Sequence, residues 1–508
     1  MTKDLEQRNI EGTRYSFIGK TLSAVILFVL SVVVTRYLGP DAYGELSLAI
    51  TIILFTSVFI DFGFNRSTQK HISQYMRDDL ESVKDAYRKM LNLKVISVIV
   101  SVAFIFLVSG FLGSIFDSST LSDLLKAGSL LLAGTILLEF NLSVLQGYES
   151  FKQLQRVNIA EAGLKFLATL IVIYLGMNVL GILAGFSLTT FLLSVFVTIV
   201  LYLFIMNDKT VNPLPDNYNK NKSRDLRKEI ISYAPPIYLS VIFFLIYTKF
   251  DILVLGYFQG TTEVGYYSLA TGLIDNLLIP LVAIETTIMP LAASLFGKVH
   301  DRNHMNVLFN QTFVNSFFFM MPIIAGLIVV ASTFVKEVYG QDFLKTAFVL
   351  IALTPFIFTK TIAVLNGAFL IGANKATVFM KYTFGAVILN ILLLVVLIPS
   401  IGIYGAVLAK VVSHSVLTFS MLIYIIKYFK VEIDSSSLLK CVKIVISSIV
   451  MAILSYFVLY VSGGKAYGLV LTMISGAIFY IILLHITKTV TFKQLLEMSR
   501  GNLPADEL

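Results

Sequence analysis

The chain has 508 residues, 57% of them hydrophobic, and a mean hydropathy of +0.84. A soluble domain is usually about 45–50% apolar, so the composition excludes an ordinary soluble protein and requires a lipid bilayer around most of the chain. The net charge is +8, which in a membrane protein indicates basic cytoplasmic loops rather than a nucleic-acid partner.

Fourteen apolar runs are long enough to span about 30 Å of hydrocarbon at about 1.5 Å per residue. Their centres lie near residues 26, 55, 102, 133, 167, 191, 244, 277, 322, 355, 390, 412, 452 and 476. The first run lacks the short apolar core and cleavage site of a signal peptide, so we expect it to be retained. We therefore predict an all-α polytopic membrane protein with 14 transmembrane helices.

Two turns that separate apolar runs have similar sequences. Residues 35–49 read TRYLGPDAYGELSLA and residues 256–270 read GYFQGTTEVGYYSLA, which aligns Gly44 with Gly265. Two further glycine pairs have nearly the same separation along the chain, Gly147 with Gly372 and Gly181 with Gly405. A repeat of this length predicts two six-helix halves related by a pseudo-twofold axis along the membrane normal.

The repeat also predicts the domain boundaries. We expect an N-lobe of helices 1–6 at residues 1–206 and a C-lobe of helices 7–12 at residues 231–430. Residues 207–230 between them are polar and basic and are predicted to be a cytoplasmic linker. Residues 431–508 contain helices 13 and 14, which have no counterpart in the repeat, and a cytoplasmic tail.

The distribution of Lys and Arg predicts the orientation. With the N-terminus inside, 30 of the 39 basic residues fall in inner segments and five in outer segments. This bias predicts a multi-pass protein of the cell membrane with both termini in the cytoplasm. The inner segment 66–94 is predicted to be an amphipathic helix on the membrane surface or an ordinary solvated helix.

No enzyme motif is found in the sequence. It has no P-loop, no GxSxG and no zinc-type histidine pair, and its one cysteine, Cys441, excludes a cysteine-based metal site. We therefore expect no enzymatic activity, no cofactor and no metal centre, with a proton or a sodium ion as the coupling ion of a transporter.

Ionisable residues inside the predicted spans indicate where a ligand binds. Each costs about 2.5–3.5 kcal/mol if it faces lipid, so most should face a cavity or a partner. Converging ammonium groups would suit a phosphate or pyrophosphate group, and the candidates are Lys20, Lys249, Lys360 and Lys410. The acidic candidates for ion coupling are Asp61, Asp251 and Asp275.

Several of these charges also have simpler explanations. Glu161 and Lys165 are spaced i, i+4 and are expected to neutralise each other. Lys20 lies near an inner helix end, from which it can snorkel to the interface, and Asp61 can be interfacial. His414 shares a helix face with Lys410 and is either a titratable group or a packing residue.

Residues 35–49, followed by FIDFGFNRSTQKHIS at residues 59–73, resemble the N-terminal signature of the polysaccharide transporter family. This family contains flippases for lipid-linked oligosaccharides, including O-antigen units. It belongs to the multidrug/oligosaccharidyl-lipid/polysaccharide exporter superfamily. The resemblance implies two lobes that alternate between inward-open and outward-open states around a central cavity, with the polyprenyl tail of the substrate in lipid.

The resemblance also implies roles for individual residues. Lys20, Lys249 and Lys360 lie in helices whose basic residues hold the pyrophosphate in relatives. Asp251 and Asn390 match the residue types of a sodium site found in some relatives.

These observations predict a flippase that moves polyprenyl-pyrophosphate-linked oligosaccharide, such as an O-antigen or other surface repeat unit, from the inner to the outer leaflet. Transport would proceed by alternating access, driven by an ion gradient or the membrane potential. The expected partners are this lipid-linked oligosaccharide, membrane lipid and polysaccharide assembly proteins, and no nucleic acid. The alternatives are a multidrug or cation antiporter of the same superfamily and a non-transporting scaffold of a glycan assembly complex.

Overall fold

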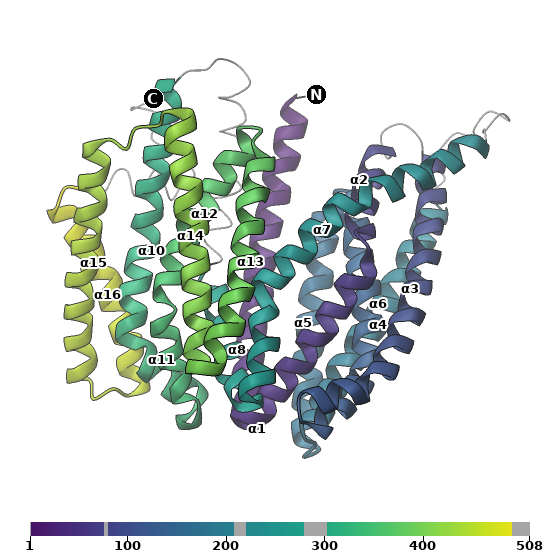
Figure 1. Ribbon diagram of the computed structural model, residues 1–508, viewed down its shortest axis with the longest axis horizontal. Helices are drawn as coiled ribbons and strands as arrows, with labels where there is room; N and C mark the ends of the chain where they lie inside the picture. The colour runs from purple at the N-terminus through teal and green to yellow at the C-terminus, as the bar shows by residue number, and fades with distance from the viewer. Residues whose placement is uncertain (1, 76–79, 208–219, 279–301, 490–508) are drawn as a thin grey trace. The chain divides into compact units, whose positions relative to one another are not determined.

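The computed structural model describes residues 2–75, 80–207, 220–278 and 302–489. Residues 208–219 of the predicted linker and the tail from residue 490 lie outside these ranges. The described chain is almost entirely helical and divides into two compact units, Met1–Gly265 and Tyr266–Leu508 (Figure 1).

In the first unit, α4 packs against α1, α3 and α6, and α5 packs against α1 and α6. The described helices of this unit are α1 (Thr2–Asp61), α2 (Phe64–Tyr75), α3 (Leu80–Ile115), α4 (Ser119–Gly147), α5 (Phe151–Tyr174), α6 (Val179–Asn207), α7 (Lys220–Gln259) and the start of α8 (Thr261–Leu277). Helix α7 begins inside the segment predicted as a linker, where Lys, Arg, Leu and Glu favour a helix.

In the second unit, α14 packs against α12 and α13, and α15 packs against α10 and α16. Beyond the end of α8, the described elements are α10 (Arg302–Tyr339), the short 3-10 helix η1 (Gln341–Phe343), α11 (Leu344–Ala352), α12 (Thr354–Gly372), α13 (Ala376–Ile401), α14 (Ile403–Phe429), α15 (Ser435–Val461) and α16 (Ala466–Ile486).

Twelve helices in the described ranges are long and apolar enough to cross a membrane. The first of them, Ile18–Asp61, has 44 residues and contains two predicted spans, because the backbone is non-helical at Gly39 and the chain reverses there (Figure 1). The span predicted near residue 277 begins in α8 and extends past the described residues. The all-α membrane fold is confirmed, and the number of 14 spans stays a prediction.

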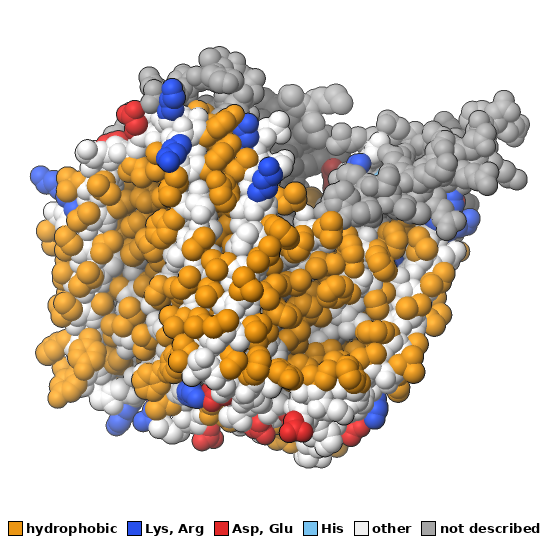
Figure 2. All heavy atoms as spheres, viewed as in Figure 1, with side chains coloured by type: hydrophobic (Ala, Val, Ile, Leu, Met, Phe, Trp, Pro, Cys, Tyr) orange, Lys and Arg blue, Asp and Glu red, His pale blue; other side chains and the backbone are white. Residues whose placement is uncertain are grey.

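The surface of the spans is apolar. Figure 2 shows hydrophobic side chains over the middle of the visible face, with Lys, Arg, Asp and Glu gathered toward its edges. Large apolar side chains are widely exposed, as at Leu107 on α3 (84%) and Phe196 on α6 (63%). Apolar exposure on this scale is unfavourable in water and expected in lipid.

The internal repeat is visible in equivalent hydrogen bonds. Asn141 on α4 is fully buried and donates its amide to the Ser194 carbonyl oxygen on α6 at 2.9 Å. Asn366 on α12 is equally buried and donates to the Thr418 carbonyl oxygen on α14 at 3.0 Å. Asn141 and Asn366 are separated along the chain by nearly the same number of residues as the glycine pairs, and so are Ser194 and Thr418. The same hydrogen bond between two helices therefore forms once in each half.

The two similar turns also have equivalent backbones. Gly39 and its repeat partner Gly260 have φ angles of 73° and 81°, values that glycine adopts without steric cost. After each turn the chain enters a new helix, and both turns belong to the first unit.

The helix starts after these turns touch through their main chains. A Cβ atom at Gly44 would overlap the carbonyl oxygen of Thr261, and one at Gly265 would overlap the carbonyl oxygen of Pro40. Thr261 also donates its hydroxyl to the Asp41 carboxylate. We call this contact the glycine contact; it brings the two copies of the repeated turn together.

The polar segment 66–94 forms two helices rather than one. Helix α2 packs against α3, α4 and α7, and its residues His71 and Ile72 are each 1% exposed. A Cβ at Gly147 would meet Ile72, so α2 is fixed to the end of α4. Its location at a membrane surface stays a prediction.

We predict that Gly44→Ala destabilises the protein by about 1–3 kcal/mol, because the added methyl group overpacks a main-chain contact that cannot move aside. Thermal unfolding of the detergent-solubilised protein measures the effect. Gly163→Ala on α5 is the matched control, since a Cβ there meets nothing within 4 Å. Equal melting temperatures for the two variants would show that the glycine contact is not tight.

Candidate functional site

Two lysines of the second unit lie beside one aromatic ring. Lys410 on α14 is only 8% exposed, and its Nζ lies 5.5 Å from the centre of the Phe356 ring and 5.6 Å from that of Tyr267. Lys360 on α12 lies one helical turn after Phe356, with its Nζ 5.4 Å from the same ring centre. The aromatic faces stabilise the two ammonium groups where water is scarce.

A histidine and a carboxylate complete this cluster. The His414 ring, one turn after Lys410, meets the Phe356 ring edge to face at 4.8 Å between centroids. Asp275 on α8 lies 3.5 Å from Lys360 Nζ, with their side chains 53% and 28% exposed. We call Lys360, Lys410, His414, Phe356, Tyr267 and Asp275 the lysine cluster.

A third helix positions the buried lysine. Asn390 on α13 donates its amide to Ser413 Oγ at 3.0 Å, and Ser413 Oγ donates to the Lys410 carbonyl oxygen at 3.2 Å. Asn390 is 3% exposed. Its side chain therefore holds α13 against the turn of α14 that carries Lys410.

The repeat shows that the fold does not need these charges. Aligning Asn141 with Asn366 makes Thr135 the first-half equivalent of Lys360. Aligning their acceptors, Ser194 and Thr418, makes Phe186 the equivalent of Lys410. Neutral residues thus fill the same places in the first half, so the shared framework does not require the two charges. Because ammonium groups bind phosphate as point charges, the lysine cluster is suited to an anionic group.

The structure therefore brings together three of the predicted site residues, Lys360, Lys410 and Asp275, and places Asn390 behind them. The other four predicted residues lie in the first unit: Lys20 and Asp61 on α1, and Lys249 and Asp251 on α7.

These four have different environments. Lys20 is exposed and Lys249 is half-buried. Asp251 is 3% exposed, and its Oδ1 accepts a hydrogen bond from the Ile252 amide at 3.0 Å. Whether any of these side chains contacts a substrate or an ion stays a prediction.

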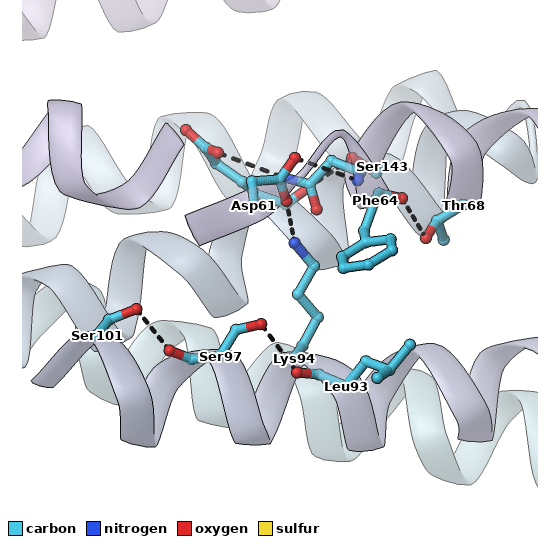
Figure 3. A network of polar contacts seen from close by, with 10 residues as sticks. Asp61, Phe64, Thr68, Leu93, Lys94, Ser97, Ser101 and Ser143 are labelled. Atoms are coloured by element: carbon cyan, nitrogen blue, oxygen red, sulfur yellow. Dashed lines mark hydrogen bonds and ion pairs between the residues drawn. The ribbon is translucent and has the colours of Figure 1, made fainter. Parts of the chain in front are cut away.

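Asp61 belongs to a second charged network. Lys94 on α3 is fully buried, and Figure 3 shows its side chain reaching across to the Asp61 carboxylate at the end of α1, beside the Phe64 ring. On α3, Ser97 and Ser101 hydrogen-bond to backbone carbonyl groups one turn earlier. Asp61 is thus paired inside the protein.

Asn65 extends this network to α4. Its backbone N–H donates to Asp61 Oδ2, and its side-chain Nδ2 donates to Glu139 Oε2, both at 3.4 Å. On the neighbouring helix α5, Lys165 Nζ donates to Glu161 Oε1 at 2.6 Å, so the expected mutual neutralisation of this pair is confirmed.

Sequence reasoning misses two essential members of these sites. From the sequence, Lys94 is assigned to the basic residues of an inner segment. The apolar residues that follow it in LKVISVIV nevertheless indicate that a span has begun. Phe356 is not a candidate because a single aromatic residue in an apolar run gives no signal. Its role follows only from the positions of Lys360 and Lys410 in space.

A bundle of helices long and apolar enough to span a membrane, with an internal repeat, defines a polytopic membrane protein. The family model described as "polysaccharide biosynthesis protein" matches residues 33–348. The chain belongs to this family.

Two curated relatives are similar in sequence. The probable low-salt glycan biosynthesis flippase Agl15 of Haloferax volcanii is 23% identical over 497 residues, covering 97% of this chain and 96% of the relative. An uncharacterized membrane protein in the cps region of Klebsiella pneumoniae is 21% identical over 348 residues, covering 67% and 66% of the two chains. The first relative's name describes a transporter, in line with the expectation of no enzymatic activity.

Two solved structures share the fold. The lipid II flippase MurJ in an inward closed conformation has a TM-score of 0.71 at 16% identity, covering 96% of this chain and 100% of that one. An inward-facing multidrug resistance transporter of the MATE family has a TM-score of 0.68 at 14% identity, covering 82% and 98%.

We predict that Lys94→Met destabilises the protein by about 3–5 kcal/mol at neutral pH, because it leaves the Asp61 carboxylate without its buried partner. Thermal unfolding of the detergent-solubilised protein measures the effect.

The matched control is Lys89→Met on the same helix. Its i, i+4 pair with Asp85 is partly exposed, with side chains 36% and 33% accessible, and such pairs contribute at most about 0.5 kcal/mol. If both variants melt alike, Lys94 does not form a buried pair in the folded protein.

Proposed function

We propose that this transporter is a flippase that moves polyprenyl-pyrophosphate-linked oligosaccharide from the inner to the outer leaflet of the cell membrane. The observation that carries the proposal is the lysine cluster, in which Lys360 and Lys410 share the ring of Phe356. Two ammonium groups at one point inside a membrane protein suit a doubly charged pyrophosphate. The name of the Haloferax relative, a glycan biosynthesis flippase, supports the same substrate class.

The cluster also supports a way to release the substrate. Lys360 interacts with the Asp275 carboxylate at 3.5 Å and with the Phe356 ring. Pyrophosphate would compete with both partners for the ammonium group. A transported headgroup must bind weakly enough to leave, and a lysine with an alternative anionic partner meets this requirement.

The remaining site roles are part of the proposal. Lys20 and Lys249 would hold the headgroup together with the lysine cluster. Ion coupling, by a proton or sodium, would involve Asp61, Asp251, Asp275 and Asn390. Alternating access would carry the headgroup across while the polyprenyl tail remains in lipid, and polysaccharide assembly proteins would use the product.

The positive character of the lysine cluster argues against the multidrug alternative. A carrier of cationic amphiphiles needs carboxylates and aromatic faces without competing ammonium groups. In the lysine cluster, as the described residues define it, two ammonium groups lie beside the Phe356 ring, and Asp275 lies 3.5 Å from one of them.

The test is a flipping assay in proteoliposomes with a fluorescent polyprenyl-pyrophosphate oligosaccharide, with and without a proton or sodium gradient. We expect protein-dependent transfer of the label between leaflets. No transfer of any glycan, together with efflux of cationic dyes, would refute the flippase and favour a multidrug carrier.

We predict that Lys360→Gln and Lys410→Gln each reduce the flipping rate at least about tenfold, because a charge-assisted hydrogen bond contributes about 1.5–3 kcal/mol. The same flipping assay measures the rates. The control is Lys375→Gln, which removes a lysine that also lies over a tyrosine ring, 4.5 Å from the centre of Tyr428, but outside the spans. Unchanged flipping in both cluster variants would refute the headgroup site.

We further predict that reporters fused to either terminus report a cytoplasmic location, since most Lys and Arg residues would then lie on the inner side. Paired fusions active only inside or only outside the cell measure this. An outer signal from the C-terminal fusion would refute the proposed orientation.

A further inference from the structure

The charges around α4 in the first unit do not balance. Asp61 is paired with Lys94, and Glu161 is paired with Lys165. Glu139 is a third carboxylate in the same region with no ammonium partner of its own among the described residues. With every group ionised, these five residues carry a net charge of −1 inside a membrane.

Glu139 lies in the span of α4, within hydrogen-bonding distance of Asn65 just after the end of α1. It is eight residues before the end of α4 at Gly147, a distance of about 12 Å along the helix axis. Its side chain is not fully buried in the protein, yet the region around it offers few charges. A carboxylate at this depth is costly unless it is paired or protonated.

Carboxylates outnumber ammonium groups around Glu139. The charged groups that act on it from the helices around α4 are Asp61 on α1, Lys94 on α3 and Glu161 on α5. Two of these three are carboxylates, and the single lysine is already bonded to Asp61. Helix α6, which also packs against α4, contains no charged residue. Helix α2 carries the neutral Asn65 and the buried, titratable His71.

Asn65 is suited to both protonation states of Glu139. Its Nδ2 donates to Glu139 Oε2, which satisfies a carboxylate. Its Oδ1 is buried and accepts no hydrogen bond within the described ranges. A flip of the amide, which exchanges its nitrogen and oxygen, presents Oδ1 to Glu139, where it would accept a hydrogen bond from a protonated carboxyl.

The repeat indicates that the fold does not require a carboxylate here. Glu139 stands two positions before Asn141 on α4, and the residue two positions before the equivalent Asn366 on α12 is Val364. An apolar side chain thus fills the equivalent place in the second half, so the acid is an addition to the shared framework.

We propose that Glu139 is a necessary proton-binding site for coupling to a proton gradient, in addition to the four ion-coupling residues named above. Binding of one proton converts the carboxylate to a neutral carboxyl, brings the five-residue charge from −1 to zero and reverses the hydrogen bond with Asn65. The site is separate from the lysine cluster. Its role in transport rests on the proposed function, whereas proton binding itself does not.

The first experiment requires no substrate. Infrared difference spectra of the purified full-length protein, recorded during a pH titration, resolve the C=O stretch of protonated carboxyl groups. We expect a titrating band that is lost in Glu139→Gln and retained in Glu139→Asp, which keeps the acid. It should also be retained in Asp123→Asn, which removes a surface carboxylate that is 61% exposed on the same helix. A band that persists in a folded Glu139→Gln protein would overturn the proposal.

The second experiment measures coupling in the flipping assay. The wild type should flip faster with a proton gradient than without it, and the ratio of the two rates should fall to one in Glu139→Gln. A ratio that still responds to the gradient in Glu139→Gln would overturn the proposal even if flipping is robust. If the wild type flips no glycan, the proposed function fails, and the infrared titration alone decides whether Glu139 binds the proton.

Discussion

Hydrocarbon cannot solvate a charge, so each ionisable group in a span of this protein depends on a partner supplied by the protein. The described structure meets this requirement in three ways. Lys94 reaches Asp61 from a neighbouring helix, and Lys165 reaches Glu161 from the next turn of its own helix. Lys410 lies over aromatic rings instead. The first two arrangements are ion pairs, whereas the third also places an ammonium group beside aromatic rings.

This difference separates structural charges from functional ones. A buried ion pair that loses one member is strongly destabilised, so Lys94 and Asp61 are constrained by folding whatever else they do. A lysine over a ring gains less from its neighbours, and the place of Lys410 in the repeat is taken by Phe186 in the first half. The framework shared by the two halves therefore does not depend on the charge of Lys410.

Much of the architecture could be predicted from the sequence because hydropathy and spacing act locally. Apolar runs indicate the helices, and the glycine pattern at Gly44 and Gly265 indicates the repeat, which the paired bonds of Asn141 and Asn366 display in three dimensions. Two spans merge into α1 because of the geometry of the turn at Gly39, and α7 starts at Lys220 because of helix propensity. Hydropathy measures neither property.

The sites could be predicted only in part. Lys360, Lys410 and Asp275 are candidates because each is a charge in an apolar run, and that signal is local. Their meeting around Phe356 depends on how α8, α12 and α14 pack, which no local pattern states. Lys94 escapes prediction for the opposite reason, since it lies at the boundary between a basic segment and a span.

The glycine contact has a consequence for how such a transporter can diversify. At Gly44 and Gly265 the two turns contact each other through backbone atoms. Side-chain substitutions elsewhere do not alter these atoms. The lysine cluster, in contrast, consists of side chains. In the first half of the repeat, neutral residues occupy the positions equivalent to Lys360 and Lys410. Under the proposed function, exchange of a few cluster residues would change the cargo preference, while the contact between the repeated turns is kept.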